Sequence, residues 1–189
     1  MILTSLQHTI KTKVLTAYTK HLVRKSKKKQ LRDKAHRTPH IGLLYTYNPA
    51  IPEQSEVITQ AVNKLQAAQQ PVHVLCYLSE KIIPSIPIPF DTFTPQQINL
   101  LGKASHQPLN AFVYTPFTHL YHLDTTSNTI LDYIIAKSVA KHKIGHYQAA
   151  RAPLFDIMFK DVSSAEVPTA ASFSSMLDKM FHYIHMLKV

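Results

Sequence analysis

HIGLLYTYNPAIPEQSEVITQAVNKLQAAQQPVHVLCYL, residues 40–78, is the stretch of sequence that decides the fold. Its two ends, 40–46 and 72–78, are short apolar runs next to proline-containing turns, which is typical of buried strands. Residues 53–69 place apolar side chains at helical spacing, and Glu53 and Glu56 lie in the first turn, where the helix dipole favours acidic groups. A strand, a helix and a strand within roughly 40 residues predict a right-handed parallel crossover.

The alternation of strands and helices continues toward the C-terminus. Further strands are expected at 118–123, 143–147 and 154–159, and further helices at 127–141 and 172–187. This order predicts one α/β domain over residues 38–189, a three-layer, Rossmann-like arrangement with a mostly parallel sheet, preceded by a long basic N-terminal helix.

The proline-rich segment 81–95 interrupts this pattern. Proline cannot donate to a strand ladder, so we expect an extended surface stretch there. Thr94 is expected to cap a short helix that has Pro95 at its first position and Gly102 just beyond its end.

The first 37 residues carry the excess positive charge of a chain whose formal net charge is +10. They hold 11 of the 21 lysines and arginines and a single acidic residue, Asp33, whereas residues 38–189 hold ten basic and ten acidic side chains. Their apolar residues recur every three or four positions, as on one side of a helix: Leu3, Leu6, Ile10, Val14, Tyr18 and Leu22. The pair Thr38-Pro39 stops this pattern. Residues 1–37 are therefore predicted to form a basic, amphipathic helical arm that is separable from the body.

The cysteine content and the hydropathy pattern indicate a compartment. The single cysteine, Cys76, has apolar neighbours, so we expect a buried thiol and a reducing environment. No apolar run approaches the roughly 20 residues that span a bilayer, and the N-terminus has no signal-peptide pattern. The expectation is a soluble, cytoplasmic protein.

The three glycines argue against a conventional nucleotide site. Gly42, Gly102 and Gly145 are isolated from one another, so the chain has no glycine-rich loop that would let a backbone wrap phosphates. Gly145 is expected to serve a bend or close packing.

Twelve histidines raise the question of a metal site. His119 and His122 would point to opposite faces of a strand, whereas His182 and His185 could share one face of a helix. The chain has no H-E-x-x-H motif and no cysteine pair. We therefore predict no metal and no cofactor, and expect the histidines to have surface or interface roles.

No set of catalytic residues stands out. Ser138 lies inside the predicted helix 127–141 and is expected to be a small packing residue. Asp124, Asp132 and Asp156 cannot be paired from the sequence, and Asp156 is expected to start or cap a strand. We accordingly predict that the protein is not an enzyme.

Three C-terminal segments carry a family resemblance: LDYIIAKSVAKHKIG at 131–145, FDIM at 155–158 and HYIHML at 182–187. They resemble an uncharacterised family, a domain of unknown function, of short proteins from Bacteroidetes-type bacteria that also begin with a basic helix. Relatives often place an acidic residue where this chain has Thr118. The resemblance implies the α/β fold and a bacterial cytoplasm, and it implies no mechanism.

The function is therefore expected to reside in the basic arm. Dense lysine and arginine without acidic neighbours is typical of contact with phosphate backbones, and the excess of lysine, eight to three, favours point-charge contact over base reading. The predicted nucleic-acid-binding residues are Lys20, Arg24, Lys25, Lys27, Lys28, Lys29, Arg32, Lys34 and Arg37. The prediction is a non-enzymatic RNA-binding protein, specifically a ribosome-associated one that holds ribosomal RNA.

Two other classes of function stay open at this point. The apolar stripe of the arm could lie in a lipid interface or dock on a protein partner, with the cations meeting an anionic membrane surface. The body could also be an α/β enzyme with an unrecognised site.

Overall fold

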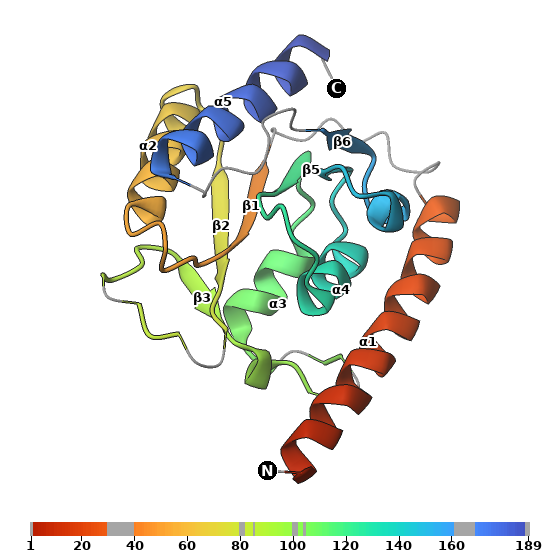
Figure 1. Ribbon diagram of the computed structural model, residues 1–189. Helices are drawn as coiled ribbons and strands as arrows, with labels where there is room; N and C mark the ends of the chain where they lie inside the picture. Colours follow the sequence, from red (N-terminus) through yellow and green to blue (C-terminus); the bar gives the residue numbers. More distant parts are fainter. Residues whose placement is uncertain are drawn as a thin grey trace.

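A six-stranded sheet forms the centre of the computed structural model, which describes residues 2–29, 40–79, 82–84, 86–99, 102–103, 105–160 and 169–187. The strand order is β3-β2-β1-β4-β5-β6 (Figure 1). The strands are β1 (Ile41–Thr46), β2 (Val72–Tyr77), β3 (Asp91–Phe93), β4 (His119–His122), β5 (His142–His146) and β6 (Ile157–Phe159). The predicted α/β fold is confirmed, and all five strand pairings are parallel.

Strand β1 is the centre of the sheet. It pairs with β2 from Ile41 opposite Val72, and with β4 from Ile41 opposite His119. Along the chain, β2 and then β3 extend the sheet on one side of β1. The next three strands, β4, β5 and β6, extend it on the other side. The carboxyl ends of β1 and β4 therefore form the topological switch point, which is where open α/β sheets usually bind ligands.

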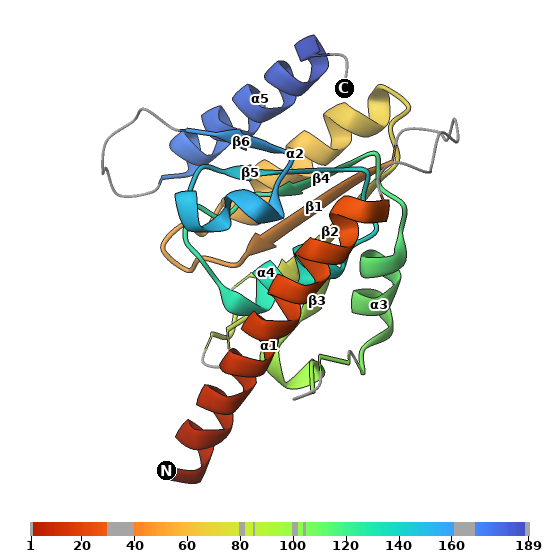
Figure 2. The same ribbon diagram turned by 90° about the vertical axis from the view of Figure 1, so that its right-hand side faces the viewer.

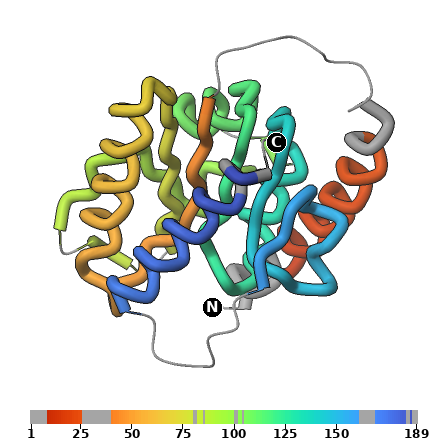
Figure 3. Tube along the Cα trace, turned by 90° about the horizontal axis from the view of Figure 1, so that it is seen from above, coloured from red at the N-terminus to blue at the C-terminus, as the bar shows by residue number. Residues whose placement is uncertain are grey.

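Helices cover both faces of the sheet. Their bounds are α1 (Ile2–Lys29), α2 (Gln54–Ala67), α3 (Gln107–Tyr114), α4 (Thr129–Lys137) and α5 (Ala170–Leu187). Helices α2 and α5 lie side by side on one face, and α1, α3 and α4 lie on the other (Figures 1 and 2). Seen from above, α1 lies at the opposite end of the molecule from α2 (Figure 3). Because side chains alternate along β1, Leu43 and Tyr45 belong to the first apolar core and Leu44 to the second.

Several predicted elements differ from the structure. The proline-rich segment contains the edge strand β3, which lies between Pro89 and Pro95 and is held by its pairing with β2. Helix α3 was not predicted, and the strand expected at 154–159 is shorter than predicted, because residues 149–154 form a 3₁₀ helix and β6 begins only at Ile157. Helix α4 ends at Lys137, so Ser138 follows the helix and is buried there, with its hydroxyl accepting from the amide of Ala140.

The short helix after Thr94 is confirmed as a 3₁₀ turn, Pro95–Gln97, in which the Gln97 side chain accepts from the amide of Thr94 at 2.9 Å. It ends well before Gly102, which has a positive φ of 73°. The close packing expected at Gly145 is also confirmed, because a Cβ there would lie 2.5 Å from the ring of Phe155.

Candidate nucleic-acid interface

Helix α1 is packed against the body. It lies alongside α4 (Figures 1 and 2), and Leu15 is 1% exposed in an apolar cluster with Leu131 and Ile135 of α4. Leu22, two turns beyond Leu15, packs on the same cluster. Helix α1 therefore adds to the second core of the domain along this face.

The predicted apolar stripe is only partly correct. Leu22 faces the body as part of that stripe, but Ile10 and Tyr18 are 46% and 45% exposed, and the most deeply buried side chain, Leu15, was not singled out. The buried line is centred on residues 15 and 22, which are separated by two helical turns. The side chains of Leu3 and Leu6 lie outside the described residues. The division of the chain at residue 37 stays a prediction.

The outward side of α1 is basic. Lys13, Lys20 and Arg24 are exposed there, Lys25 is exposed at the edge of that side, and the sequence has no acidic residue before Asp33. Lys20, Arg24 and Lys25 are therefore placed where a polyanion can reach them. The other predicted contacts, namely the side chains of Lys27, Lys28 and Lys29 and all of Arg32, Lys34 and Arg37, lie outside the described part of the chain.

Aromatic side chains adjoin this basic helix where α1, α3 and α4 meet. The Lys137 ammonium lies 5.8 Å from the ring centre of Tyr114 and 5.6 Å from that of Tyr133. The Tyr133 hydroxyl donates to the carbonyl of Gly102 at 2.7 Å, and the Lys137 ammonium donates to the same oxygen at 3.3 Å. Burial raises the pKa of Tyr133, as do the nearby hydroxyls of Tyr114 and Tyr18. Sequence reasoning missed Tyr114 and Lys137, because no local pattern links them to α1.

Four histidines line the amino-terminal edge of the sheet. His40 precedes β1, His73 is the second residue of β2, and His119 and His142 begin β4 and β5. The rings of His119 and His142 stack with their centres 5.7 Å apart. The pKa of His142 is lowered by burial and by Lys141, with Asp156 acting in the opposite direction.

The opposite sides predicted for His119 and His122 are confirmed. His119 lies beside Tyr121 of the first core, and His122 lies beside Phe155, which packs on the second core. The pair His182 and His185 cannot be compared in the same way, because the side chain of His185 lies outside the described residues.

Buried polar groups fill the switch point at the carboxyl ends of β1 and β4. Asp124 accepts from the amide of Thr46 at 2.8 Å and from its hydroxyl at 2.6 Å. Nε2 of His122 lies 3.5 Å from Asp124 Oδ2, and Nδ1 of His122 lies 3.2 Å from Nη2 of Arg151. A guanidinium only donates, so we assign the proton of this imidazole to Nε2, facing Asp124.

The network continues to α4. Arg151 is 3% exposed, and it contacts Asp132 Oδ1 through Nε at 2.9 Å and Nη2 at 2.7 Å. Burial alone would raise the pKa of Asp124, but the neighbouring imidazole of His122 and the hydrogen bonds from Thr46 outweigh it and hold that pKa below its ordinary value. Of the three aspartates that the sequence left unpaired, Asp124 and Asp132 belong to this network, whereas Asp156 precedes β6 and accepts from the amide of Lys143 at 2.8 Å. These contacts hold the loops after β1 and β4 together, although Nε2 of His122 is buried without a close hydrogen-bond partner among the described residues.

Hydrogen bonds from a buried side chain also fill the space between the end of β1 and the start of α2. The Gln54 side chain donates to the carbonyl of Thr46 at 3.2 Å and accepts from the amide of Asn48 at 2.9 Å. In dinucleotide-binding folds a glycine-rich turn leaves this position open for a pyrophosphate. Here a buried glutamine side chain occupies it.

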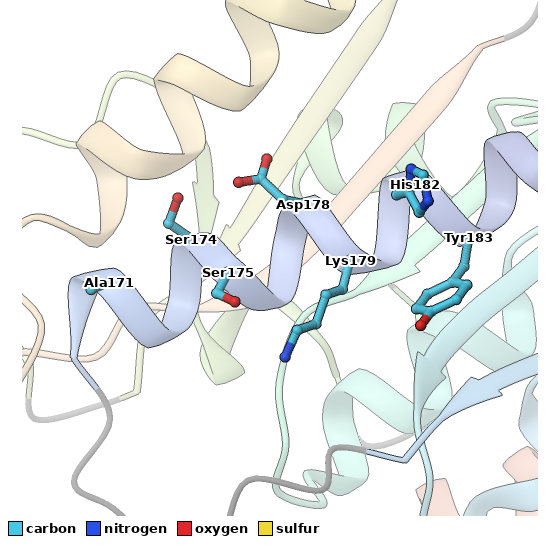
Figure 4. Close-up of a pocket in the computed structure, with 7 residues that line it drawn as sticks. All are labelled: Ala171, Ser174, Ser175, Asp178, Lys179, His182 and Tyr183. Carbon is cyan, nitrogen blue, oxygen red and sulfur yellow. The ribbon is translucent and has the colours of Figure 1, made fainter.

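Other parts of the described structure offer weaker candidates. A shallow depression on the outer side of α5 (Figure 4) is lined by Ala171, Ser174, Ser175, Asp178, Lys179, His182 and Tyr183. No group of three or more histidine, cysteine or acidic side chains suits a metal ion among the described residues. Cys76 is buried as predicted, and burial raises its pKa to about 12. Among the described residues, no helix has the length and hydropathy to span a membrane.

Burial of the charged Lys143 side chain is expected to lower the free energy of unfolding. It is buried, its ammonium donates weakly to the carbonyl of Ala136 at 3.5 Å, and burial lowers its pKa from 10.5 to about 8, with Asp156 opposing the shift. This shift corresponds to a penalty of roughly 3 kcal/mol for the charged form. We expect Lys143→Met to raise the free energy of unfolding at pH 7 by about 1–3 kcal/mol.

The pH dependence identifies the cause. Between pH 8 and 10.5 the unfolded chain binds more protons at Lys143 than the folded chain, so this group's contribution to stability rises with pH. The advantage of Lys143→Met should therefore shrink over that window in urea unfolding at pH 7, 8, 9 and 10. The exposed neighbour Lys141→Met is the control. An advantage that stays constant with pH would contradict the assignment.

Comparisons with known proteins give a family. The description "Family of unknown function (DUF6913)" matches residues 11–187, and the chain belongs to that family. No curated protein and no solved structure matches the chain.

Proposed function

We propose that the chain is a non-enzymatic RNA-binding protein that holds phosphates with the basic side of α1. The observation that carries this proposal is the orientation of that helix. Leu15 is buried against the body, while Lys13, Lys20, Arg24 and Lys25 are exposed. A docked helix holds its cations on a fixed surface, so less backbone freedom is lost when the partner binds.

The charge distribution supports a polyanionic partner. Clustered cations without acidic neighbours repel one another, and phosphates relieve that repulsion while releasing their counterions. The rest of the chain is formally neutral, so α1 and the segment after it would orient the protein on its partner. Lysine predominates, which favours contact with the RNA backbone over recognition of particular bases.

The partner we propose is ribosomal RNA in the cytoplasm of a Bacteroidetes-type bacterium. The protein would be ribosome-associated, with the α/β body as its docking domain. Sedimentation of the native protein from a cell extract at low and then high salt tests this: co-sedimentation with ribosomes that is lost at high salt is expected. Sedimentation with membranes would favour the membrane-surface alternative, which the burial of Leu15 in the protein's own core weakens.

Salt dependence tests the phosphate contacts directly. Replacing Lys20, Arg24 and Lys25 together by glutamine should weaken binding to unrelated RNAs about equally. The slope of log affinity against log salt should flatten by about 2–3 units, because each lost contact removes roughly 0.7–0.9. Fluorescence anisotropy between 50 and 200 mM salt, a range chosen because such binding changes steeply there, gives both quantities.

A matched triple variant distinguishes the effect of losing cations from α1 from the effect of lowering the net charge of the protein. Lys64, Lys160 and Lys179 are exposed on other elements, and their replacement by glutamine removes the same charge. We expect this variant to keep nearly the whole slope. Equal effects of the two triple variants would show that overall charge, rather than α1, determines binding, and an unchanged slope in both would remove α1 from the interface.

A further inference from the structure

We infer that the surface where α1, α3 and α4 meet binds single-stranded RNA, with Tyr18 and Tyr114 as platforms on which unpaired bases stack. This inference rests on the proposed function and specifies the form of RNA that it takes. It adds a base-contacting part to an interface that the charge pattern alone describes as phosphate contact.

The two tyrosines are exposed yet held in place. Tyr114 is the last residue of α3 and is 60% exposed, and Tyr18 lies in the middle of α1. Both lie close enough to the hydroxyl of Tyr133 to raise its pKa. Tyr133 is buried and donates a hydrogen bond to the carbonyl of Gly102, so its side chain is held in a fixed position beneath this surface. The two tyrosines come from helices that both pack on α4, the helix that carries Tyr133.

Cations flank these rings. The Lys137 ammonium lies within 6 Å of the ring centres of both Tyr114 and Tyr133, in the range of cation–π contact. On α1, Lys25 is seven residues beyond Tyr18, so it lies on the same side of the helix at a distance of about 10 Å. Rings with adjacent cations are the combination that single-strand-binding proteins use, with stacking for bases and charge for the backbone.

The form of RNA follows from what an aromatic side chain can reach. In an A-form duplex the bases are paired and stacked, and proteins contact mainly phosphates and 2′-hydroxyls. Only an unpaired base presents its face to a tyrosine. Two other exposed tyrosines, Tyr147 after β5 and Tyr183 on α5, belong to none of these three helices and provide an internal comparison.

The test uses the full chain and two labelled probes, a 12-nucleotide oligouridine and a blunt 12-base-pair RNA duplex. The variant Tyr18→Leu/Tyr114→Leu should bind the single strand about 5- to 10-fold more weakly for each tyrosine lost, with duplex affinity changed less than twofold. Tyr18→Phe/Tyr114→Phe keeps both rings and should bind the single strand as the wild type does. Tyr147→Leu/Tyr183→Leu is the matched control and should change neither affinity.

Photo-crosslinking of a 4-thiouridine oligomer to the wild-type protein gives a measurement that needs no variant to fold. Crosslinks at Tyr18 or Tyr114, located by mass spectrometry, are expected. Crosslinks confined to other residues, or a leucine variant that weakens duplex and single strand equally, would overturn this inference while leaving phosphate binding by α1 intact. Failure of the wild type to bind either probe would overturn the proposed function as well.

Discussion

Replacing Arg151 by leucine is expected to lower the free energy of unfolding by about 3–5 kcal/mol. The guanidinium lies in the interior, where it contacts Asp132 through two nitrogens and donates to His122. Its removal leaves the Asp132 carboxylate without this cation in a poorly hydrated place and deprives the imidazole of a donor. Urea unfolding followed by far-UV circular dichroism measures the loss.

Three further variants identify the source of that loss. Arg151→Lys keeps the charge but has no planar fork, so an intermediate loss is expected. Arg24→Leu removes an exposed arginine from α1 and should change stability by less than about 0.5 kcal/mol. Arg151→Leu combined with Asp132→Leu should cost less than the sum of the two single changes, because both remove one interaction. A loss below about 1 kcal/mol for Arg151→Leu would show that the network does not hold the switch point together.

Leu15→Ala is expected to destabilise the whole domain by about 2–5 kcal/mol, the usual range for truncating a buried leucine. The side chain is buried in a cluster that includes Leu131 and Ile135, so the change leaves a cavity between α1 and α4. Ile10→Ala in the same helix is the matched control. Ile10 is about half exposed, and its truncation should have a much smaller effect on the urea midpoint.

The same experiment examines the predicted division of the chain. If α1 belongs to the cooperative unit, Leu15→Ala shifts the single unfolding transition. If residues 38–189 fold independently, Leu15→Ala leaves the transition of the body where it is in the wild type. A chain that starts at residue 38 would then unfold at that same midpoint, and residues 1–37 would be a separable arm as the sequence predicts.

The central crossover could be predicted from the sequence because its signals are local. The apolar runs of β1 and β2 and the spacing in α2 give element bounds within about two residues of those observed, the usual margin at element ends. Strand β3 and helix α3 could not be predicted in this way. Strand β3 has three residues and exists through its pairing with β2, and α3 is eight residues long, too short for its apolar residues to repeat over several turns.

In the candidate site, too, the features with local sequence signals could be predicted and those that depend on packing could not. The cations of α1 are evident from the sequence, because consecutive residues carry them. The side of α1 that is buried could not be predicted, since it depends on which helix packs against it. The switch-point network joins Arg151 to Asp132 and His122, 19 and 29 residues away, and Tyr18 and Tyr114 come near Tyr133 only after α1 and α3 have packed on α4.

The contact between α1 and α4 also sets an order of events during translation. Leu15 is synthesised about 115 residues before Leu131, an interval of roughly 6–23 s at 5–20 residues per second. Throughout that interval the helix has been made but the surface it packs against has not. A nascent chain therefore presents a basic, half-apolar helix to its surroundings, and the first surface within reach is that of the ribosome making it. Any contact formed there competes with closure of the domain until α4 emerges.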